Sequence, residues 1–134
     1  MNGIADTGFL VAFANRRDEF FPWAHALAES SHKPLLTCEA VLAETAFDLK
    51  DSAPTLKLVA RGLVRLAFDL GSQFAELAKL ARPYADRQPD LADLCLIRMS
   101  ELGPKLPLIT IDGDFRVYRR NRLKRIPVIM PPGI

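Results

Sequence analysis

Short apolar runs alternate with longer stretches of helical pattern along the whole sequence. The apolar runs fall at residues 2–6, 35–37, 65–69, 106–111 and 126–130. The helical stretches fall at residues 9–15, 23–30, 38–50, 54–64, 73–85, 90–102 and 114–122. Strands that alternate with helices favour a mostly parallel sheet with helices on both faces. We therefore predict an α/β fold, a three-layer α/β/α sandwich, in which residues 1–134 form a single domain.

Local signals give the expected ends of several helices. Pro22 suits the first turn of the helix at 23–30, because its φ is fixed and it has no N–H to satisfy. Thr37 could cap the helix that follows it. Gly71-Ser72 indicates a break before the next helix, which Pro83 then interrupts.

Composition excludes several classes of protein. Apolar residues make up 49% of the chain, so we do not expect disorder. No apolar run approaches the roughly 20 residues of a membrane helix, and no secretory signal pattern follows Met1. We expect Cys38 and Cys95 to be small core residues, with a disulfide as the alternative. These features predict a cytoplasmic protein with no membrane partner.

Two of the predicted strands end at an acidic residue. Asp6 closes the first run, and Asp112 follows the run at 106–111. In an open α/β sheet, ligands bind in the crevice beyond the carboxyl ends of the strands, so both side chains should point there. Glu44 and Asp93 lie on predicted helices that could bring them to the same place.

Four converging carboxylates would suit a hard divalent cation. Mg²⁺ takes oxygen ligands, and one or two such ions could orient a water for attack on a phosphodiester bond. The sequence contains no HExxH, zinc-type Cys/His spacing, P-loop or GxGxxG pattern. The net charge is +2, from 18 basic and 16 acidic residues. With four acids neutralised by a cation, the remainder would be 18 minus 12, or +6, which suits a polyanionic partner.

Three of these acids also have an ordinary structural explanation. Asp6 could cap a helix, and Asp112 could form an Asp-Gly turn with Gly113. Asp93 shares a helical arc with other charged residues, as a solvent-facing stripe would: Asp90, Arg98 and Glu101.

Glu44 is harder to explain as a surface residue. On a helical wheel it is flanked by Val41 and Phe47, away from the polar face of its helix. Burial of a carboxylate is costly unless something pairs with it. Asp48 adds a like charge one turn further on. We therefore expect a cation close to Glu44.

Four blocks of sequence, in order and spanning nearly the whole chain, carry a recognisable pattern. They are Asp6-Thr7-Gly8-Phe9-Leu10-Val11-Ala12 with Asn15-Arg16-Arg17-Asp18 and Trp23-Ala24, then Leu36-Thr37-Cys38-Glu39-Ala40-Val41-Leu42-Ala43-Glu44, then Asp90-Leu91-Ala92-Asp93-Leu94-Cys95-Leu96-Ile97, and Ile109-Thr110-Ile111-Asp112-Gly113-Asp114-Phe115. Together these blocks resemble PIN-domain ribonucleases, and most of all the VapC-type toxins of bacterial toxin–antitoxin pairs.

The resemblance implies a PIN-like fold and a Mg²⁺-dependent endoribonuclease, with Mn²⁺ as a substitute cofactor. It also implies an RNA substrate, a cognate antitoxin and a homodimer. Asp90 and Asp114 are acids close to assigned ones and could share or replace their roles, while Thr7 and Thr110 could support them with hydroxyl groups. Carried over by position, the catalytic and metal-binding roles fall on Asp6, Glu44, Asp93 and Asp112.

Two rival functions stay open. The first is a metal-dependent phosphatase or DNA nuclease, although an aspartyl phosphatase would carry its acid pair just after the first strand, where Thr7-Gly8 follows Asp6. The second is a non-catalytic PIN-like binding module whose acids seat a partner's arginines. The function of the basic tail also has two equal interpretations. It could form a solvated helix face, or it could bind RNA through Arg116, Arg119 and Arg120.

Overall fold

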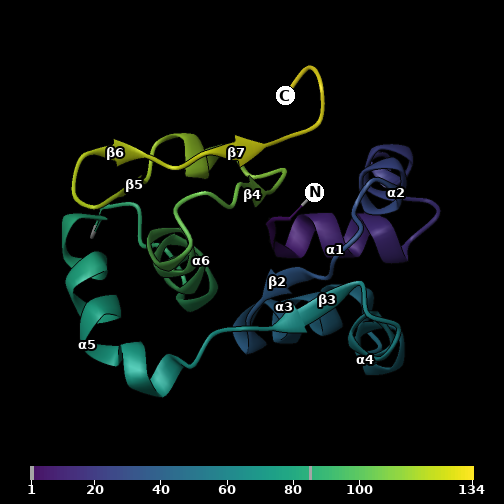
Figure 1. Cartoon of the computed structure of the whole chain (residues 1–134), viewed down its shortest axis with the longest axis horizontal. Helices are drawn as coiled ribbons and strands as arrows, with labels where there is room; N and C mark the ends of the chain where they lie inside the picture. Colours follow the sequence, from purple (N-terminus) through teal and green to yellow (C-terminus); the bar gives the residue numbers. More distant parts are fainter. Residues whose placement is uncertain (1, 85) are drawn as a thin grey trace.

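The core of the fold is a five-stranded parallel sheet. A computed structural model describes residues 2–84 and 86–134. The strand order is β3-β2-β1-β4-β7, and every neighbouring pair is parallel (Figure 1). The strands are short: β1 (Ile4–Ala5), β2 (Leu35–Thr37), β3 (Val64–Leu66), β4 (Leu108–Ile109) and β7 (Val128–Ile129). The predicted mostly parallel sheet is confirmed.

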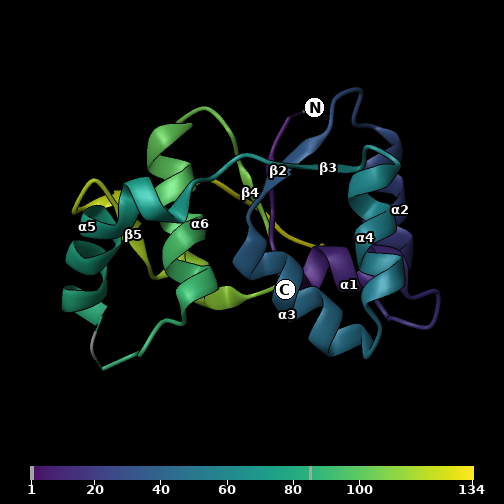
Figure 2. The same cartoon turned by 90° about the horizontal axis from the view of Figure 1, so that it is seen from below.

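Within residues 2–84 and 86–134, six α-helices surround this sheet. They are α1 (Thr7–Ala14), α2 (Phe21–Glu29), α3 (Glu39–Leu49), α4 (Ser52–Ala60), α5 (Leu70–Ala81) and α6 (Leu91–Leu102). Helix α1 packs on α2 and α3, α3 packs on α4, and α5 packs on α6. Figure 2 shows α5 and α6 on one side of the strands and α1, α2 and α4 on the other. The predicted three-layer arrangement is confirmed.

The strands and helix α6 form the centre of the core. Ile4, Leu35, Leu108 and Ile109 are fully buried, as expected for parallel strands covered on both faces. Seven of the twelve residues of α6 are buried. The two cysteines are buried and free, so the expectation of small core residues is confirmed.

Helices α4 and α5 start earlier than the sequence predicted, because Asp side chains cap them. Helix α4 begins at Ser52, where Asp51 accepts a hydrogen bond from the Ala53 N–H. Helix α5 begins at Leu70, where Asp69 accepts from the Gly71 N–H. The Gly-Ser pair therefore lies inside the first turn and breaks nothing.

Two further boundaries were wrong for local reasons. Helix α4 ends at Ala60 because Gly62 adopts a positive φ of 80°, and β3 follows at Val64. Thr37 does not cap α3, since the N-cap residue is Cys38. The Thr37 hydroxyl instead donates to the Ala5 carbonyl across the sheet, at 3.0 Å.

The basic helix predicted at 114–122 is wrong. The chain forms a short 3-10 helix, η2 (Gly113–Arg116), and then an antiparallel hairpin of β5 (Arg119–Arg120) and β6 (Lys124–Arg125). Asn121 and Arg122 at the hairpin turn have positive φ values of 48° and 74°. This left-handed backbone cannot continue a right-handed helix.

A second 3-10 helix, η1 (Arg82–Tyr84), follows α5 at Pro83. It joins the sheet core through Tyr84, whose ring contacts Tyr118 edge to face. Within residues 2–84 and 86–134, none of the helices is long and apolar enough to span a membrane.

Candidate active site

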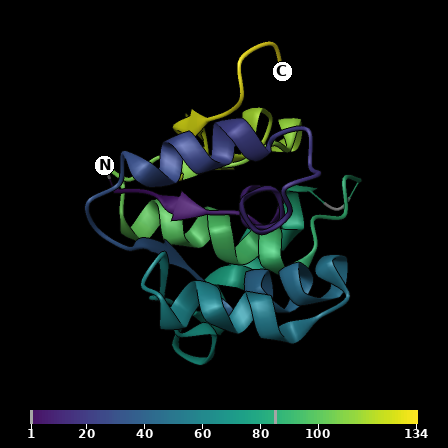
Figure 3. The same ribbon diagram turned by 90° about the vertical axis from the view of Figure 1, so that its right-hand side faces the viewer.

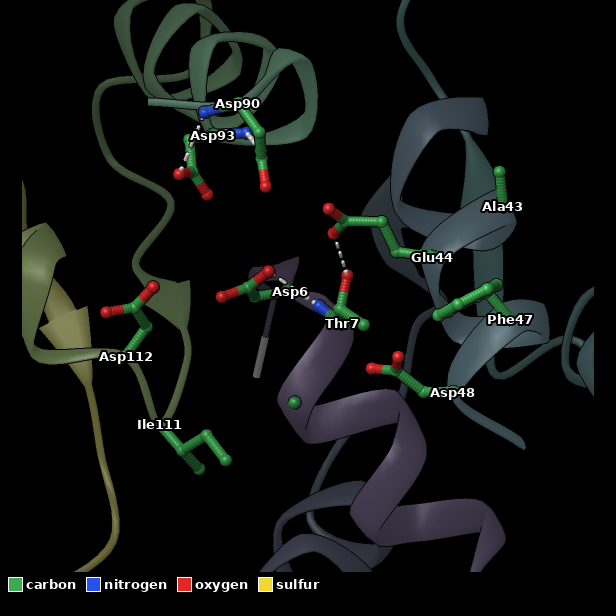
Figure 4. Close-up of a pocket in the computed structure, with 11 residues that line it drawn as sticks. Asp6, Thr7, Ala43, Glu44, Phe47, Asp48, Asp90, Asp93, Ile111 and Asp112 are labelled. Carbon is green, nitrogen blue, oxygen red and sulfur yellow. Dashed lines mark hydrogen bonds between the residues drawn. The ribbon is translucent and has the colours of Figure 1, made fainter. Parts of the chain in front are cut away.

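One cavity of about 630 Å³ opens at the carboxyl ends of β1 and β4. Strand β1 leads directly into α1, with Asp6 at the junction (Figure 3). All four predicted acids line this cavity, and their carboxylates face a common space (Figure 4). The full lining is Asp6, Thr7, Gly8, Ala43, Glu44, Phe47, Asp48, Asp90, Asp93, Ile111 and Asp112. The structure therefore brings together acids that lie far apart in the sequence.

Asp6 is the most deeply buried of these acids, with 7% of its surface exposed. One carboxylate oxygen accepts from the Thr7 N–H at 2.6 Å, which caps α1. The other accepts from the Thr110 hydroxyl at 2.6 Å. Burial raises the pKa of Asp6 to about 6, although both hydrogen bonds oppose the rise. Asp6 is thus both a helix cap and a cavity acid.

Glu44 reaches the cavity from α3. Its carboxylate accepts a 2.7 Å hydrogen bond from the Thr7 hydroxyl. Burial first, and then the nearby carboxylates of Asp90 and Asp6, raise the pKa of Glu44 to about 7.

The described residues include no ion pair to the Glu44 side chain, so the cation expected close to it stays a prediction. One expectation about the surroundings of Glu44 was wrong. Phe47, expected on an apolar face beside it, is 82% exposed and belongs to the wall of the cavity. The prediction of an apolar face beside Glu44 was based on a helical wheel, which does not show where the hydrophobic core ends.

Asp93 is fixed at the first turn of α6 by a capping box with Asp90. The Asp93 N–H donates to Asp90 at 2.8 Å, and the Asp90 N–H donates to Asp93 at 3.4 Å. Burial, and then the charges of Asp90 and Asp6, raise the pKa of Asp93 to about 7. The solvent-stripe alternative does not hold for this helix, because Arg98 and Glu101 form a partly buried ion pair of 3.1 Å.

Asp112 caps η2 at the other side of the cavity. Its carboxylate accepts from the Asp114 N–H at 2.9 Å, and its own N–H donates to the Thr110 hydroxyl at 2.9 Å. Asp114 itself is exposed, pairs with Arg87 at 3.6 Å and does not line the cavity. The sequence suggested two additional site acids, of which Asp90 lines the cavity and Asp114 does not.

Sequence reasoning missed Asp48 and Gly8 as members of the site. Asp48 lies one turn after Glu44 and lines the same cavity. The i, i+4 spacing on one helix was the available signal for Asp48. Gly8 allows Ile111 to approach α1, since a Cβ there would lie 2.5 Å from Ile111 Cγ1. That approach depends on tertiary packing and has no local signal.

The donor set of the cavity consists of carboxylate oxygens, which hard divalent cations prefer. The cavity lining contains no Lys, Arg or His, so nothing in it offsets the negative charge. Across the described residues, no three Asp, Glu, His or Cys side chains are placed so that they could hold one metal ion. The residues supply suitable ligand atoms and charge, and a cation would have to draw the carboxylates closer together.

The three candidate RNA-binding arginines lie outside the cavity lining. Arg116 donates to the Ile134 carbonyl at 2.6 Å. Arg119 donates through one nitrogen to three carbonyls of its own segment. Arg120 donates to the carbonyls of Ser100 and Pro104, at 2.7 and 3.0 Å, and so satisfies the end of α6.

The sheet order and helix layers define the class of fold, which is the PIN-like α/β/α fold. Among solved structures, the chain is similar to the crystal structure of VapC20 from Mycobacterium tuberculosis, a toxin described as cleaving the sarcin–ricin loop. The TM-score is 0.73, the identity is 19%, and the match covers 87% of this chain and 94% of that chain. No protein-family model and no curated protein matches the sequence. The similarity therefore confirms the fold that the sequence blocks implied.

Proposed function

We propose that the protein is a divalent-metal-dependent endoribonuclease. The observation that carries this proposal is the convergence of Asp6, Glu44, Asp93 and Asp112 on one cavity that holds no basic side chain. Clustered carboxylates with raised pKa values are costly unless a cation neutralises them. Such strain is a feature of functional sites rather than of ordinary surfaces.

The four acids would hold Mg²⁺, with Mn²⁺ as a substitute. When bound, the ion supplies Lewis-acid stabilisation of a phosphoryl oxygen and lowers the pKa of water. Asp6 is held rigidly by its two hydrogen bonds, so it provides the fixed point of the site. Thr7 and Thr110 orient Glu44 and Asp6 by donating to them. Asp90 holds Asp93 at the helix end and adds negative charge.

The biological role we propose is that of a toxin restrained by a cognate antitoxin. Support comes from the shared fold with VapC20, which is described as a toxin that cleaves the sarcin–ricin loop, together with the sequence blocks that surround all four acids. We further propose a homodimer, as the same resemblance implies, and a cytoplasmic location, as the sequence features predict.

The test is cleavage of RNA by purified protein with Mg²⁺ or EDTA. We expect cleavage that requires the metal and that is lost in Glu44→Gln and Asp93→Asn, because each change removes a ligand charge and keeps side-chain volume. Asp114→Asn is the matched control, since Asp114 is a nearby acid outside the cavity. Equal rates in all four proteins would overturn the assigned site. Cleavage of DNA or of a phosphate monoester, without RNA cleavage, would favour the rival enzymes.

A further inference from the structure

Phe47 stands out among the aromatic residues of the protein. It is 82% exposed, yet it belongs to the lining of the acid cavity, one turn after Glu44 on α3. In Figure 4 its side chain extends from α3 beside Glu44 and Asp48. By contrast, Phe9 and Phe115 are fully buried in the core. Phe47 therefore contributes little to the hydrophobic core, and its position beside the acids needs another explanation.

The surroundings of Phe47 restrict what it could bind. Asp6, Glu44 and Asp48 make this side of the cavity negative, so it repels an anion that arrives without a cation. A nucleobase carries no formal charge and presents a π-face, which an exposed phenyl ring can stack against. Phe47 also has no polar atom that could read a base edge, so the contact would tolerate different bases.

We propose that Phe47 stacks on an unpaired base next to the phosphate that is cut. This inference rests on the proposed nuclease function. Bases inside a duplex are stacked on their neighbours and leave no free face for a ring. A nucleotide at the site would thus place its phosphate toward the acids and its base toward α3. Phe47 acts here as a residue that binds and positions the substrate and not as a metal ligand.

The experiment compares kinetics on a short single-stranded RNA and on the same RNA with one abasic nucleotide beside the cut. The proteins are wild type, Phe47→Leu and Phe47→Trp. Phe74→Leu is the matched control, because Phe74 is 67% exposed on α5 but does not line the cavity. We expect Phe47→Leu to raise KM about tenfold or more, from the strength of base stacking. Phe47→Trp should restore binding, and Phe74→Leu should match wild type.

The abasic substrate separates stacking from a general effect of the substitution. The KM of wild type should rise on the abasic RNA about as much as the KM of Phe47→Leu rises on the intact RNA. The KM of Phe47→Leu should rise little further when the abasic RNA replaces the intact one. If wild type cuts RNA but Phe47→Leu matches it on both substrates, the stacking proposal is overturned and the nuclease proposal stands. If Phe47→Leu changes only self-association or protein binding, stacking is also overturned. If wild type cuts no RNA with Mg²⁺ or Mn²⁺, both proposals fail.

Discussion

The Thr110 hydroxyl donates to the Asp6 carboxylate at 2.6 Å, although 104 positions separate the two residues in the sequence. The same hydroxyl oxygen accepts from the Asp112 N–H at 2.9 Å. One buried side chain therefore connects the acid after β1 with the acid after β4. Because both acids line the cavity, the spacing between them depends on Thr110.

Thr110→Val should lower both stability and activity. Valine has a similar shape but neither donor nor acceptor, so it leaves one carboxylate oxygen of Asp6 and the Asp112 N–H without their partner. The expected loss is about 1–3 kcal/mol in the free energy of unfolding. Urea denaturation followed by circular dichroism measures this loss. Thr110→Ser keeps the hydroxyl and should recover most of the RNA cleavage. If the two variants behave equally, the Thr110 hydroxyl does not set the spacing between the two acids.

The metal-free protein should lose stability as pH rises from about 4 to about 7. The pKa values of Asp6, Glu44 and Asp93 are raised to about 6, 7 and 7 by burial. Unfolded carboxyl groups titrate near pH 4, so within this window the folded state binds more protons than the unfolded state. Stability then falls with pH, according to linkage. Melting temperatures measured in EDTA across this range test the slope, which should be shallower in Asp93→Asn.

Asp6→Asn should melt higher than wild type in EDTA at pH 8 and should respond less to Mg²⁺. Neutralising Asp6 removes a buried charge, and the rise of the Asp6 pKa to about 6 corresponds to about 3 kcal/mol. Part of that gain is lost because the amide has a single oxygen, while the two oxygens of Asp6 accept from Thr7 and Thr110. This leaves a rise of a few degrees. For wild type, Mg²⁺ at 100 times its Kd should add about 2.7 kcal/mol. Differential scanning fluorimetry at matched ionic strength would show it, and identical curves for both proteins would speak against a shared metal site.

Gly8→Ala should destabilise the fold and displace the segment that carries Asp112. The new Cβ would lie 2.5 Å from Ile111 Cγ1, so Ile111 would have to move. Overpacking of this kind costs about 1–3 kcal/mol. The double variant Gly8→Ala with Ile111→Ala should regain stability, because it restores the space. Gly113→Ala serves as the control, since nothing lies within 4 Å of its added Cβ. A neutral Gly8→Ala would contradict the close approach.

The basic tail should separate into a structural arginine and candidate RNA contacts. Arg120→Gln should cost about 1–2 kcal/mol of stability, because it removes donors from the Ser100 carbonyl in the last turn of α6 and from the Pro104 carbonyl after the helix. Arg116 is exposed, and its replacement should change stability little. If Arg116 contacts a phosphate, its loss should reduce the salt dependence of RNA binding by about one unit of slope. RNA binding measured across a salt series tests this. If the slope of the variant equals that of wild type, Arg116 is a solvated surface residue that contacts no phosphate.

The sheet and the placement of the acids could be predicted from local rules. The run at Leu35–Thr37 is a strand with the expected bounds, because parallel strands read as continuous apolar segments. Asp6 and Asp112 lie in the crevice at the strand ends, as expected for an open α/β sheet. Glu44 reaches the cavity as expected, but its supposed apolar neighbour Phe47 is exposed.

Other features could not be predicted because they depend on the assembled structure. The hairpin formed by β5 and β6 replaces a predicted helix, and its arginine-rich sequence has no apolar periodicity that would distinguish the two. The left-handed conformation of Arg122 has no signal in a residue of that type. The contact between Gly8 and Ile111 appears only once α1 and the segment after β4 are brought together.

The strand order also determines when the cavity can form during synthesis. Strand β1 lies between β2, which follows it after two helices, and β4, which is translated only after four more. One edge of β1 therefore stays unpaired while the ribosome makes α3 to α6. An unpaired strand edge can form hydrogen bonds with another chain and so promotes aggregation. Asp6 and Glu44 exist early in the nascent chain, but Thr110 and Asp112 arrive with β4. A chain translated up to α6 thus carries Asp6, Glu44 and Asp93 without the strand that spaces Asp6 from Asp112, and the complete cavity appears only after β4 has been made.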